Sequence, residues 1–588
     1  MKTLFVDHLN FYSSLKILLN RSAYDEIRLI SDPKFLSKLW NSILILFGVK
    51  IYQENFFLGD IFNSEGESTS SESTRIASLK SFEYSTWLLE QSSLQMDRKI
   101  HLEGKKVITL FFSKTVWSEM EYFIMRLLYV KNTYGVKKKY SFLFNKPSLI
   151  EIDFLKNTNK EFNLIFCGNI SALKLKQTIK FNLKKIYGLK NNLIKKNISK
   201  NKKSTVSIAT DTIDLESSGR FFPHWFKFKK HRNFYIFNFN KFEVKINQKN
   251  KIKNNIKILK DKSILFSLIN HRKFDLINKK KLPYILNLHL KSFFALANGL
   301  DQLLINLNCD KFIFIDPQDP ITDAVQLISK NIGVETRCIQ FANTSMIVPL
   351  MITLADVYLI FSKHYEKYFS WGKLRPKKFH PIGYTFISKQ ENSLNKIKKE
   401  LINDGVKTTI VYFDESVQNN KWGGISKNHN LYNLEFLAKT VLKFKEIAII
   451  LKPQFFNNSV SDLNSSIINK AIDSGRFLEL RKGKANERNL YTPSNVSQIA
   501  DYCIGDIIGA TAALECALQN KKVLLLNSFG YKTESQKIYN KSDIVFLTLR
   551  KAIKAIIDNN SNVGDWSKII TEFVAFNDGK EIDRIEKN

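Results

Sequence analysis

The sequence predicts an α/β protein in which two doubly wound parallel sheets follow one another, with a further α/β region before them. The chain has 588 residues, a length typical of about three domains. Hydrophobic residues make up 44% of it, enough for sizeable cores. Short apolar runs alternate with helical stretches, the order expected of parallel strands covered by helices. We therefore expect domains at residues 1–203, 204–387 and 388–588.

The first region begins with a strand, a helix and a second strand. Strands are expected at Thr3–Val6, Glu26–Asp32, Lys106–Phe112 and Phe162–Cys167. The serine-rich run Ser64–Thr74 is polar and of low complexity, which predicts a mobile loop. A Lys/Asn-rich stretch at 174–203 closes the region. It is either a solvated linker or a patch for phospholipid headgroups or a charged glycan. The role of the region is left open.

The second and third regions alternate strands with helices. In the second region, strands are expected at Thr205–Ala209, Phe234–Asn238, Ile264–Leu268, Phe312–Ile315, Arg337–Phe341, Val357–Phe361 and Phe379–Gly383. In the third, they are expected at Thr408–Phe413, Ile447–Leu451, Phe477–Leu480, Tyr502–Gly505, Val523–Leu526 and Ile544–Phe546. A basic insertion is expected at 241–262. Because parallel sheets bind ligands at the carboxyl ends of their strands, we expect substrates in a cleft between the two sheets.

Charge and cysteine content restrict the partners and the compartment. Lys and Arg number 90 against 55 Asp and Glu, so the net charge is +35. This excess of positive charge indicates either an anionic partner or the codon bias of AT-rich coding DNA, which favours Lys. The five scattered cysteines favour a reducing cytoplasm over a disulfide framework or zinc site. The chain lacks a secretory signal and an apolar run long enough to span a membrane. We expect a cytoplasmic protein, with peripheral contact to an anionic inner membrane face left open and no specific nucleic-acid partner.

The most informative stretch is Asp501–Asn527. A short strand is followed by the small-residue loop Gly509-Ala510-Thr511-Ala512, and this loop opens a helix containing Glu515. Backbone N–H groups in such a loop can approach a phosphate, and the helix dipole favours the same charge. Glu515 lies one turn into the helix, where its carboxylate can accept both hydroxyls of a ribose. The alternative is a capped helix with an ordinary surface Glu.

This stretch resembles the donor-site signature of GT-B glycosyltransferases, which consist of two Rossmann-like domains. The resemblance implies that Glu515 binds the nucleotide ribose and that the loop 509–512 binds phosphate. The run Ile449–Gln454 is similar to a second family run, which implies a phosphate contact for Lys452. Gln454 stands where relatives have His, and it is included in the expected donor-binding set.

Two further runs are similar to surface-polysaccharide and CDP-glycerol-type transferases. The run Gly333–Phe341, with the segments 355–361 and 380–384 after it, resembles the end of their first domain. Gln340 is then expected to face the substrates, and Gly383 to lie at the interdomain hinge, where an unusual φ is useful. In the run 410–416, the resemblance implies that Asp414 and Glu415 lie beside the donor.

Several residues are candidates for the catalytic base. An inverting transfer needs a carboxylate or His that accepts the proton of the acceptor hydroxyl. The candidates follow two strands of the second region, with Glu216, Asp211 and Asp316 as the preferred ones. The others are Asp214, His224 and Asp319. No Asp-x-Asp with a hydrophobic lead stands out, so we expect no metal and no cofactor.

The resemblance covers about Ser204–Leu547. It implies a bacterial glycosyltransferase that moves a sugar from a CMP- or other NDP-linked donor to a surface glycan or lipid-linked acceptor. Three alternatives stay open. They are a CDP-alditol phosphotransferase of a teichoic-acid-like polymer, an inactive GT-B scaffold, and a basic nucleic-acid-binding protein. The scaffold is motivated by Gln454 and Phe341, which replace family His residues.

Overall fold

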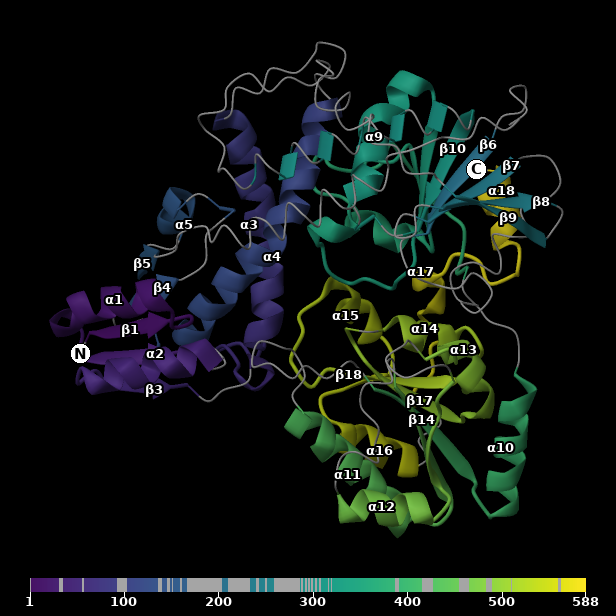
Figure 1. Cartoon of the computed structure of the whole chain (residues 1–588). Coiled ribbons are helices and arrows are strands. Elements are labelled where there is room, and N and C mark those ends of the chain that lie inside the picture. Colours follow the sequence, from purple (N-terminus) through teal and green to yellow (C-terminus); the bar gives the residue numbers. More distant parts are fainter. Residues whose placement is uncertain are drawn as a thin grey trace.

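A computed structural model gives the structure of the chain. It describes residues 2–30, 35–54, 58–91, 103–135, 140–144, 149–150, 152–158, 161–166, 204–209, 233–238, 243–248, 251–257, 308–315, 317–318, 320–385, 391–414, 427–453, 465–482, 489–508, 510–558 and 562–587, with single helical positions between 286 and 305. Within these residues there are three sheets, and helices lie against each of them (Figure 1).

The first sheet has the strand order β3-β2-β1-β4-β5, and all neighbouring strands are parallel. Its strands are β1 (Thr3–Val6), β2 (Glu26–Leu29), β3 (Ile51–Gln53), β4 (Tyr140–Phe144) and β5 (Phe162–Phe166). Its helices are α1 (Phe11–Leu19), η1 (Arg21–Ala23), α2 (Phe35–Leu46), η2 (Leu58–Asp60), α3 (Thr69–Gln91), α4 (Glu103–Tyr134) and α5 (Ile152–Thr158). The predicted α/β character of this region is confirmed.

Two predictions for the first region are wrong. The run Ser64–Thr74 is not an exposed loop, because Glu67 and Ser68 are buried and α3 begins at Thr69. The run Lys106–Phe112 is not a strand but part of α4, since a short apolar run does not distinguish a strand from a buried helix. Serine hydroxyls of α3 bond to carbonyls of the same helix, so this polar helix can pack along α4.

The middle sheet has the order β13-β12-β11-β10-β6-β7-β8-β9. Its strands are β6 (Ser204–Ala209), β7 (Asn233–Asn238), β8 (Glu243–Gln248), β9 (Lys251–Lys257), β10 (Cys309–Phe314), β11 (Glu335–Ile339), β12 (Val357–Ile360) and β13 (Lys378–Pro381). Its described helices include α9 (Pro320–Ile332), η6 (Pro349–Met351) and η7 (Lys363–Lys367). The strands are parallel from β13 to β7, and β8 and β9 continue the sheet as antiparallel strands within the predicted basic insertion. The predicted strand Ile264–Leu268 lies outside the described residues.

The third sheet is parallel throughout, with the order β16-β15-β14-β17-β18-β19. Its strands are β14 (Thr408–Asp414), β15 (Ile447–Pro453), β16 (Phe477–Glu479), β17 (Tyr502–Asp506), β18 (Lys522–Leu526) and β19 (Val545–Phe546). The helices are α10 (Asn392–Asn403), α11 (Lys427–Lys443), α12 (Ser466–Asp473), α13 (Pro493–Val496), η9 (Ser497–Ile499), α14 (Thr511–Ala517), α15 (Glu534–Tyr539), α16 (Leu549–Ile557), α17 (Ile570–Phe573) and α18 (Glu581–Lys587). Numbered along the chain, the strand order is 3-2-1-4-5-6, the order of Rossmann sheets. The predicted tandem of Rossmann-like sheets is confirmed.

The first region packs against the middle region through α4 and α9 (Figure 1). The Lys114 ammonium lies 2.8 Å from the Asp323 carboxylate in a fully buried ion pair, and it also donates to the carbonyl of Pro317. The rings of Phe111 and Phe293 stack beside it, with centroids 4.3 Å apart. A buried ion pair within an apolar contact fixes how two surfaces meet, because the wrong placement leaves a charge unpaired.

The end of the chain returns to the middle sheet, where Figure 1 shows α18. The backbone N–H of Ala575 donates to the carbonyl of Phe361, and Arg337 donates to the carbonyl of Ile585. Residues 575–587 therefore belong spatially to the middle sheet, although they follow the third sheet in sequence. The division into domains at 203 and 387 stays a prediction. Within the described residues, no helix has the length and apolar character needed to cross a membrane.

Candidate functional site

The site begins where the strand order of the third sheet reverses. The chain runs from β14 outward to β16, then returns to β17 on the other side of β14. At such a reversal the loops leave in opposite directions and open a crevice at the carboxyl ends of the strands. Asp414 is the last residue of β14, and Asp506 is the last residue of β17. Two carboxylates therefore stand at the point where the topology favours a ligand.

A depression of about 340 Å³, measured with its opening to solvent, lies at this point. Side chains from three strand ends, from α11 and from the loop after β18 line it. They are Tyr412, Phe413, Asp414, His429, Asn430, Asn433, Asp506, Leu526, Ser528 and Phe529. We call this the switch-point pocket.

His429 connects the polar and aromatic walls of the switch-point pocket. Its Nε2 lies 3.2 Å from the Asn433 side-chain amide nitrogen, one helical turn away, and its ring lies 4.9 Å from the ring of Phe529. Burial lowers the pKa of His429, and the charge of Asp60 opposes that shift in part. The imidazole is therefore neutral at pH 7 and can accept or donate a hydrogen bond according to its tautomer.

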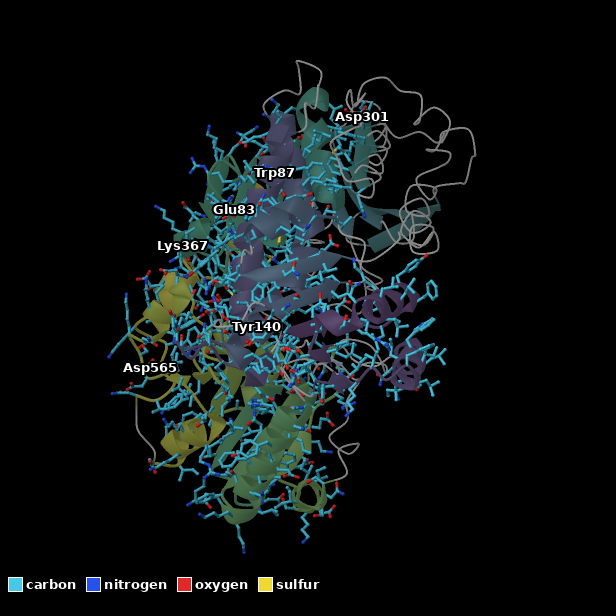
Figure 2. All side chains as sticks on the ribbon, turned by 90° about the vertical axis from the view of Figure 1, so that its left-hand side faces the viewer. Glu83, Trp87, Tyr140, Asp301, Lys367 and Asp565 are labelled. Atoms are coloured by element: carbon cyan, nitrogen blue, oxygen red, sulfur yellow. The ribbon has the colours of Figure 1, made fainter. Side chains whose placement is uncertain are left out.

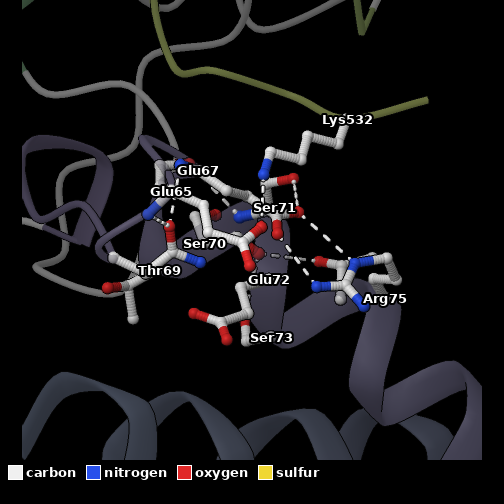
Figure 3. A network of polar contacts seen from close by, with 12 residues as sticks. Glu65, Glu67, Thr69, Ser70, Ser71, Glu72, Ser73, Arg75 and Lys532 are labelled. Carbon is white, nitrogen blue, oxygen red and sulfur yellow. Dashed lines mark hydrogen bonds and ion pairs between the residues drawn. The ribbon is translucent and has the colours of Figure 1, made fainter. Parts of the chain in front are cut away.

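The first region supports one wall of the pocket through the loop after β18. The backbone N–H of Ser68 donates to the carbonyl of Phe529 at 3.1 Å. Gly530 lies so close to Gly66 that an added Cβ would stand 1.9 Å from its carbonyl oxygen. Lys532 pairs with the Glu65 carboxylate (Figure 3). The N-terminal region thus positions a residue of the pocket in the third sheet.

Glu67 holds the segment that supports this wall. Its carboxylate is 1% exposed as a side chain and accepts a hydrogen bond from the Ser71 hydroxyl at 2.8 Å. The Arg75 guanidinium pairs with it at 2.9 Å (Figure 3). A buried carboxylate bonded in this way makes the turn before α3 rigid. The serine-rich run is therefore a structural element of the site's surroundings.

Glu515 is fully buried on α14, a few residues from Asp506 in sequence. Its Oε1 accepts a hydrogen bond from the Tyr384 hydroxyl at 2.6 Å, and its Oε2 accepts from the backbone N–H of Ser494 at 3.2 Å. Tyr384 follows β13 of the middle sheet, so this bond joins the two sheets. The predicted ribose contact of Glu515 stays a prediction, since the carboxylate is turned to protein partners here.

The loop before α14 is also bonded to the middle sheet. Asn343 donates its backbone N–H to the Thr511 hydroxyl at 2.8 Å and its side-chain amide to the Ala510 carbonyl at 3.3 Å. The Tyr365 hydroxyl donates to the Asn343 side chain at 2.8 Å, and that side chain donates to Tyr539. Ala510 is buried and Ala512 is half-buried. The predicted phosphate-binding loop is therefore a contact point between the two sheets.

A second polar contact between the sheets involves His364 of η7 and Ser535 of α15. The His364 Nε2 lies 3.1 Å from the Ser535 hydroxyl, and the Tyr368 hydroxyl lies 3.0 Å from the same oxygen. Burial, with a contribution from the nearby charge of Lys367, lowers the pKa of His364 to about 4. This histidine is neutral at pH 7 and acts there as a hydrogen-bonding partner.

The predicted role of Gln340, to face the substrates, stays a prediction. Gln340 is 1% exposed, its amide nitrogen donates to the carbonyl of Ala342, and its amide oxygen accepts from the backbone N–H of Phe361. Both ends of the side chain are thereby used to join the ends of β11 and β12. The amide satisfies backbone groups that a buried strand end would otherwise leave unpaired.

Gly383 has the unusual φ that was expected of it, and its position at an interdomain hinge stays a prediction. Its φ is +87°, and an added Cβ would lie 2.4 Å from the carbonyl oxygen of Phe576 in the returning chain end. Only glycine meets both conditions without strain. Lys452, near the end of β15, is 7% exposed, and its predicted phosphate contact stays a prediction.

Several predicted residues lie outside the described part of the chain. They are Asp211, Asp214, Glu216, His224, Asp316, Asp319, Glu415, Gln454 and Gly509. Of the predicted cleft residues that are described, Asp414 lines the switch-point pocket.

Sequence reasoning missed most of the pocket. Asp506, His429, Asn430 and Asn433 are not among the residues predicted from the sequence. The signal was present in two places. His429 and Asn433 are four residues apart on a helix, so they share one face, and Asp506 closes a buried strand in the same way as Asp414. Within the described ranges, no three His, Cys, Asp or Glu side chains are grouped as metal ligands would be.

No protein-family model matches the chain, and no curated protein matches it. Solved structures similar to it include the MnaA protein of S. aureus in a co-structure with UDP, at 14% identity over 65% of this chain and 95% of that one, with a TM-score of 0.39. The UDP-GlcNAc 2-epimerase of Neisseria meningitidis bound to UDP-GlcNAc is 10% identical over 65% of this chain and 98% of that one, with a TM-score of 0.37. A glycotransferase of kitacinnamycin is 12% identical over 66% and 99%, with a TM-score of 0.36. The fold is assigned from the strand order, and these similarities carry no argument about activity.

Proposed function

We propose that the chain is a glycosyltransferase that takes a sugar from a nucleotide-activated donor bound at the switch-point pocket. One observation carries the proposal. A polar pocket, with the carboxylates of Asp414 and Asp506 in its wall, lies at the strand-order reversal of a sheet with the Rossmann order. That is the place where such sheets bind nucleotides.

The chemistry of the pocket suits the hydroxyl-bearing part of a donor. Carboxylates and side-chain amides accept and donate hydrogen bonds to ribose or sugar hydroxyls, and the ring of Phe529 offers an apolar face. The described lining includes no Lys or Arg, so a phosphate inside the pocket would meet mainly acidic neighbours. We therefore propose that the donor phosphates bind outside it, at the loop 509–512, with Gln454 and Lys452 as further proposed contacts.

In this proposal, the middle region binds the acceptor and supplies the catalytic base. The base is proposed among Glu216, Asp211 and Asp316, which follow strands of the middle sheet in sequence. Carboxylates at the carboxyl ends of those strands would face the donor across the interface of the two sheets. The acceptor is a surface glycan or a lipid-linked sugar, the donor a CMP- or other NDP-linked sugar, and the transfer requires no metal. These finer features come from the resemblance of the sequence.

A second candidate is a scaffold that binds a nucleotide sugar without transferring it. The burial of Glu515 favours it, because a carboxylate bonded to Tyr384 and Ser494 is already satisfied by the protein. In this candidate, Phe341 and Gln454 stand at two positions where the family has His. The histidine chemistry is lost there, and the fold is kept.

A nucleotide-binding experiment tests both candidates, the glycosyltransferase and the scaffold that binds a nucleotide sugar. Thermal unfolding of the full chain is followed with CMP, CDP, UDP and GDP, and then with sugar conjugates of whichever nucleotide stabilises it. We expect one nucleotide to raise the unfolding midpoint, and Asp506→Asn to reduce that shift. Asp473→Asn, at an exposed position at the end of α12, is the matched control. Release of free nucleotide from the conjugate when an acceptor is present identifies a transferase, and binding without release identifies the scaffold. No shift with any nucleotide would sink both.

A further inference from the structure

One face of the first sheet carries an exposed apolar surface. It is formed by α1, α2 and the turn that follows α2, which adjoin through the rings of Phe11 and Trp40. We call it the α1–α2 face. Six of its apolar side chains are 44–84% exposed, namely Phe11, Leu15, Leu19, Leu39, Leu46 and Phe47.

The core of the first region does not require these side chains. Ile17 of α1 and Leu44 of α2 already fill the space against β1 and β2, where both are buried. The outward residues therefore make the two helices apolar on a second side. Single exposed apolar residues are ordinary, whereas a contiguous group on adjacent helices marks an interaction surface.

The opposite side of the same sheet is already occupied. There α4 covers β1 and β4, with Phe5 against Tyr134 and the Asp7 carboxylate accepting from the Tyr122 hydroxyl. The same helix packs on the middle region. Within the described part of the chain, the α1–α2 face is thus turned away from the middle and third regions, as its position at the margin of Figures 1 and 2 shows.

The charge of the α1–α2 face points to the kind of partner. Residues 8–24 and 33–53, which carry the two helices and their flanks, contain five Lys or Arg and no Asp or Glu. Lys38 and Lys50 are exposed beside Leu39 and Leu46. An apolar helix surface with aromatic residues, flanked by cations and free of acids, matches an anionic bilayer.

We propose that the α1–α2 face docks the chain on an anionic lipid membrane, with Leu46 and Phe47 inserted among the acyl chains and the lysines at the level of the headgroups. Lysine stems lie along apolar surface while their ammonium groups stay with the lipid phosphates. The protein then lies on the bilayer without crossing it. The inference stands on the first region alone and does not depend on the activity of the third sheet.

Flotation of the full chain with vesicles tests this proposal. Vesicles of phosphatidylcholine with phosphatidylglycerol are compared with vesicles of phosphatidylcholine alone. The variant Leu46→Gln/Phe47→Gln is compared with Ile402→Gln/Leu547→Gln, whose side chains are 56% and 58% exposed on other elements. We expect the anionic vesicles to bind the wild type and the control. The variant in the α1–α2 face should bind at least tenfold more weakly, and 0.5 M salt, on the order of a 4 Å Debye length, should weaken all binding.

Two results would overturn the proposal. Equal binding of both double variants would assign the lipid affinity to other basic segments of this +35 chain. Absence of vesicle binding, together with a wild-type dimer that Leu46→Gln/Phe47→Gln makes monomeric, would assign the face to a second copy of the chain. The nucleotide response of the variant, measured in parallel, reports on folding and stays unchanged in either case.

Discussion

Two carboxylates near the carboxyl edge of the third sheet lie only nine positions apart in the sequence, but their environments are opposite. Glu515 is fully buried and accepts hydrogen bonds from Tyr384 and Ser494. Asp506 lines an open pocket and accepts a hydrogen bond from the backbone N–H of Ile508 at 3.0 Å. A carboxylate that joins two sheets contributes to stability, whereas a carboxylate at a crevice is placed where a ligand can reach it. Proximity in a motif therefore does not establish a shared role.

Removal of Glu515 is expected to give the largest effect. Glu515→Ala removes the carboxylate that accepts from the Tyr384 hydroxyl and from the Ser494 N–H, which costs about 3 kcal/mol. Tyr384→Phe removes one bond and costs about 1 kcal/mol. The unfolding midpoint, measured by calorimetry, should fall in that order. A variant of unchanged stability that no longer responds to nucleotide would instead make Glu515 a ligand-binding residue.

The next largest effect on stability is expected at Gly383, which precedes Tyr384. Gly383→Ala is expected to cost about 2–3 kcal/mol, because a positive φ adds to a collision with the carbonyl of Phe576. Gly372→Ala is the control, since its φ is +55° with nothing within 4 Å, and its cost is about 1 kcal/mol. Equal losses of stability in the two variants would show that the returning chain end moves away from the added Cβ. The close contact between Gly383 and Phe576 would then contribute little to stability.

The pocket carboxylate is expected to affect affinity more than stability. Asp506→Asn keeps the size of the side chain and removes its charge, so the unfolding midpoint should change little. The affinity for the stabilising nucleotide sugar should fall about tenfold, or 1.4 kcal/mol. Titration calorimetry measures the affinity and scanning calorimetry measures the unfolding midpoint, with Asp473→Asn alongside. An affinity that Asp506→Asn leaves intact would move the donor away from the switch-point pocket.

The smallest effect concerns pH and the contact of His364 with Ser535. The folded pKa of His364, about 4, is lowered from 6.5, so the unfolded chain binds the proton more tightly. The contribution of neutral His364 is therefore complete above pH 6.5 and is lost as the pH falls towards 4, by about 1 kcal/mol after screening by solvent. Between pH 7.5 and 5, the wild type should lose more stability than His364→Gln. Parallel losses would contradict the assignment.

The sequence predicted most of the sheet architecture and part of the site. Strand positions of the third sheet followed from short apolar runs such as Ile447–Leu451, which alternate with helical stretches in the order of a covered parallel sheet. The helices α3 and α4 were missed because serine-rich and β-branched sequences have weak helix propensity, and tertiary packing overrides it. Asp414 was found through the resemblance of the run 410–416. His429 was missed because it reaches the pocket from a different helix, through tertiary contacts that no local pattern records.

Hydrogen exchange of the full chain, with and without the nucleotide sugar that stabilises it, shows whether the donor binds at the switch-point pocket. The switch-point pocket predicts slower exchange in residues 427–433, which carry His429 and Asn433, and in residues 502–508, which carry Asp506. The segment 513–517 should change little, since its side chains are already buried. Slowing confined to 513–517, with residues 427–433 unaffected, would contradict binding of the donor at this pocket.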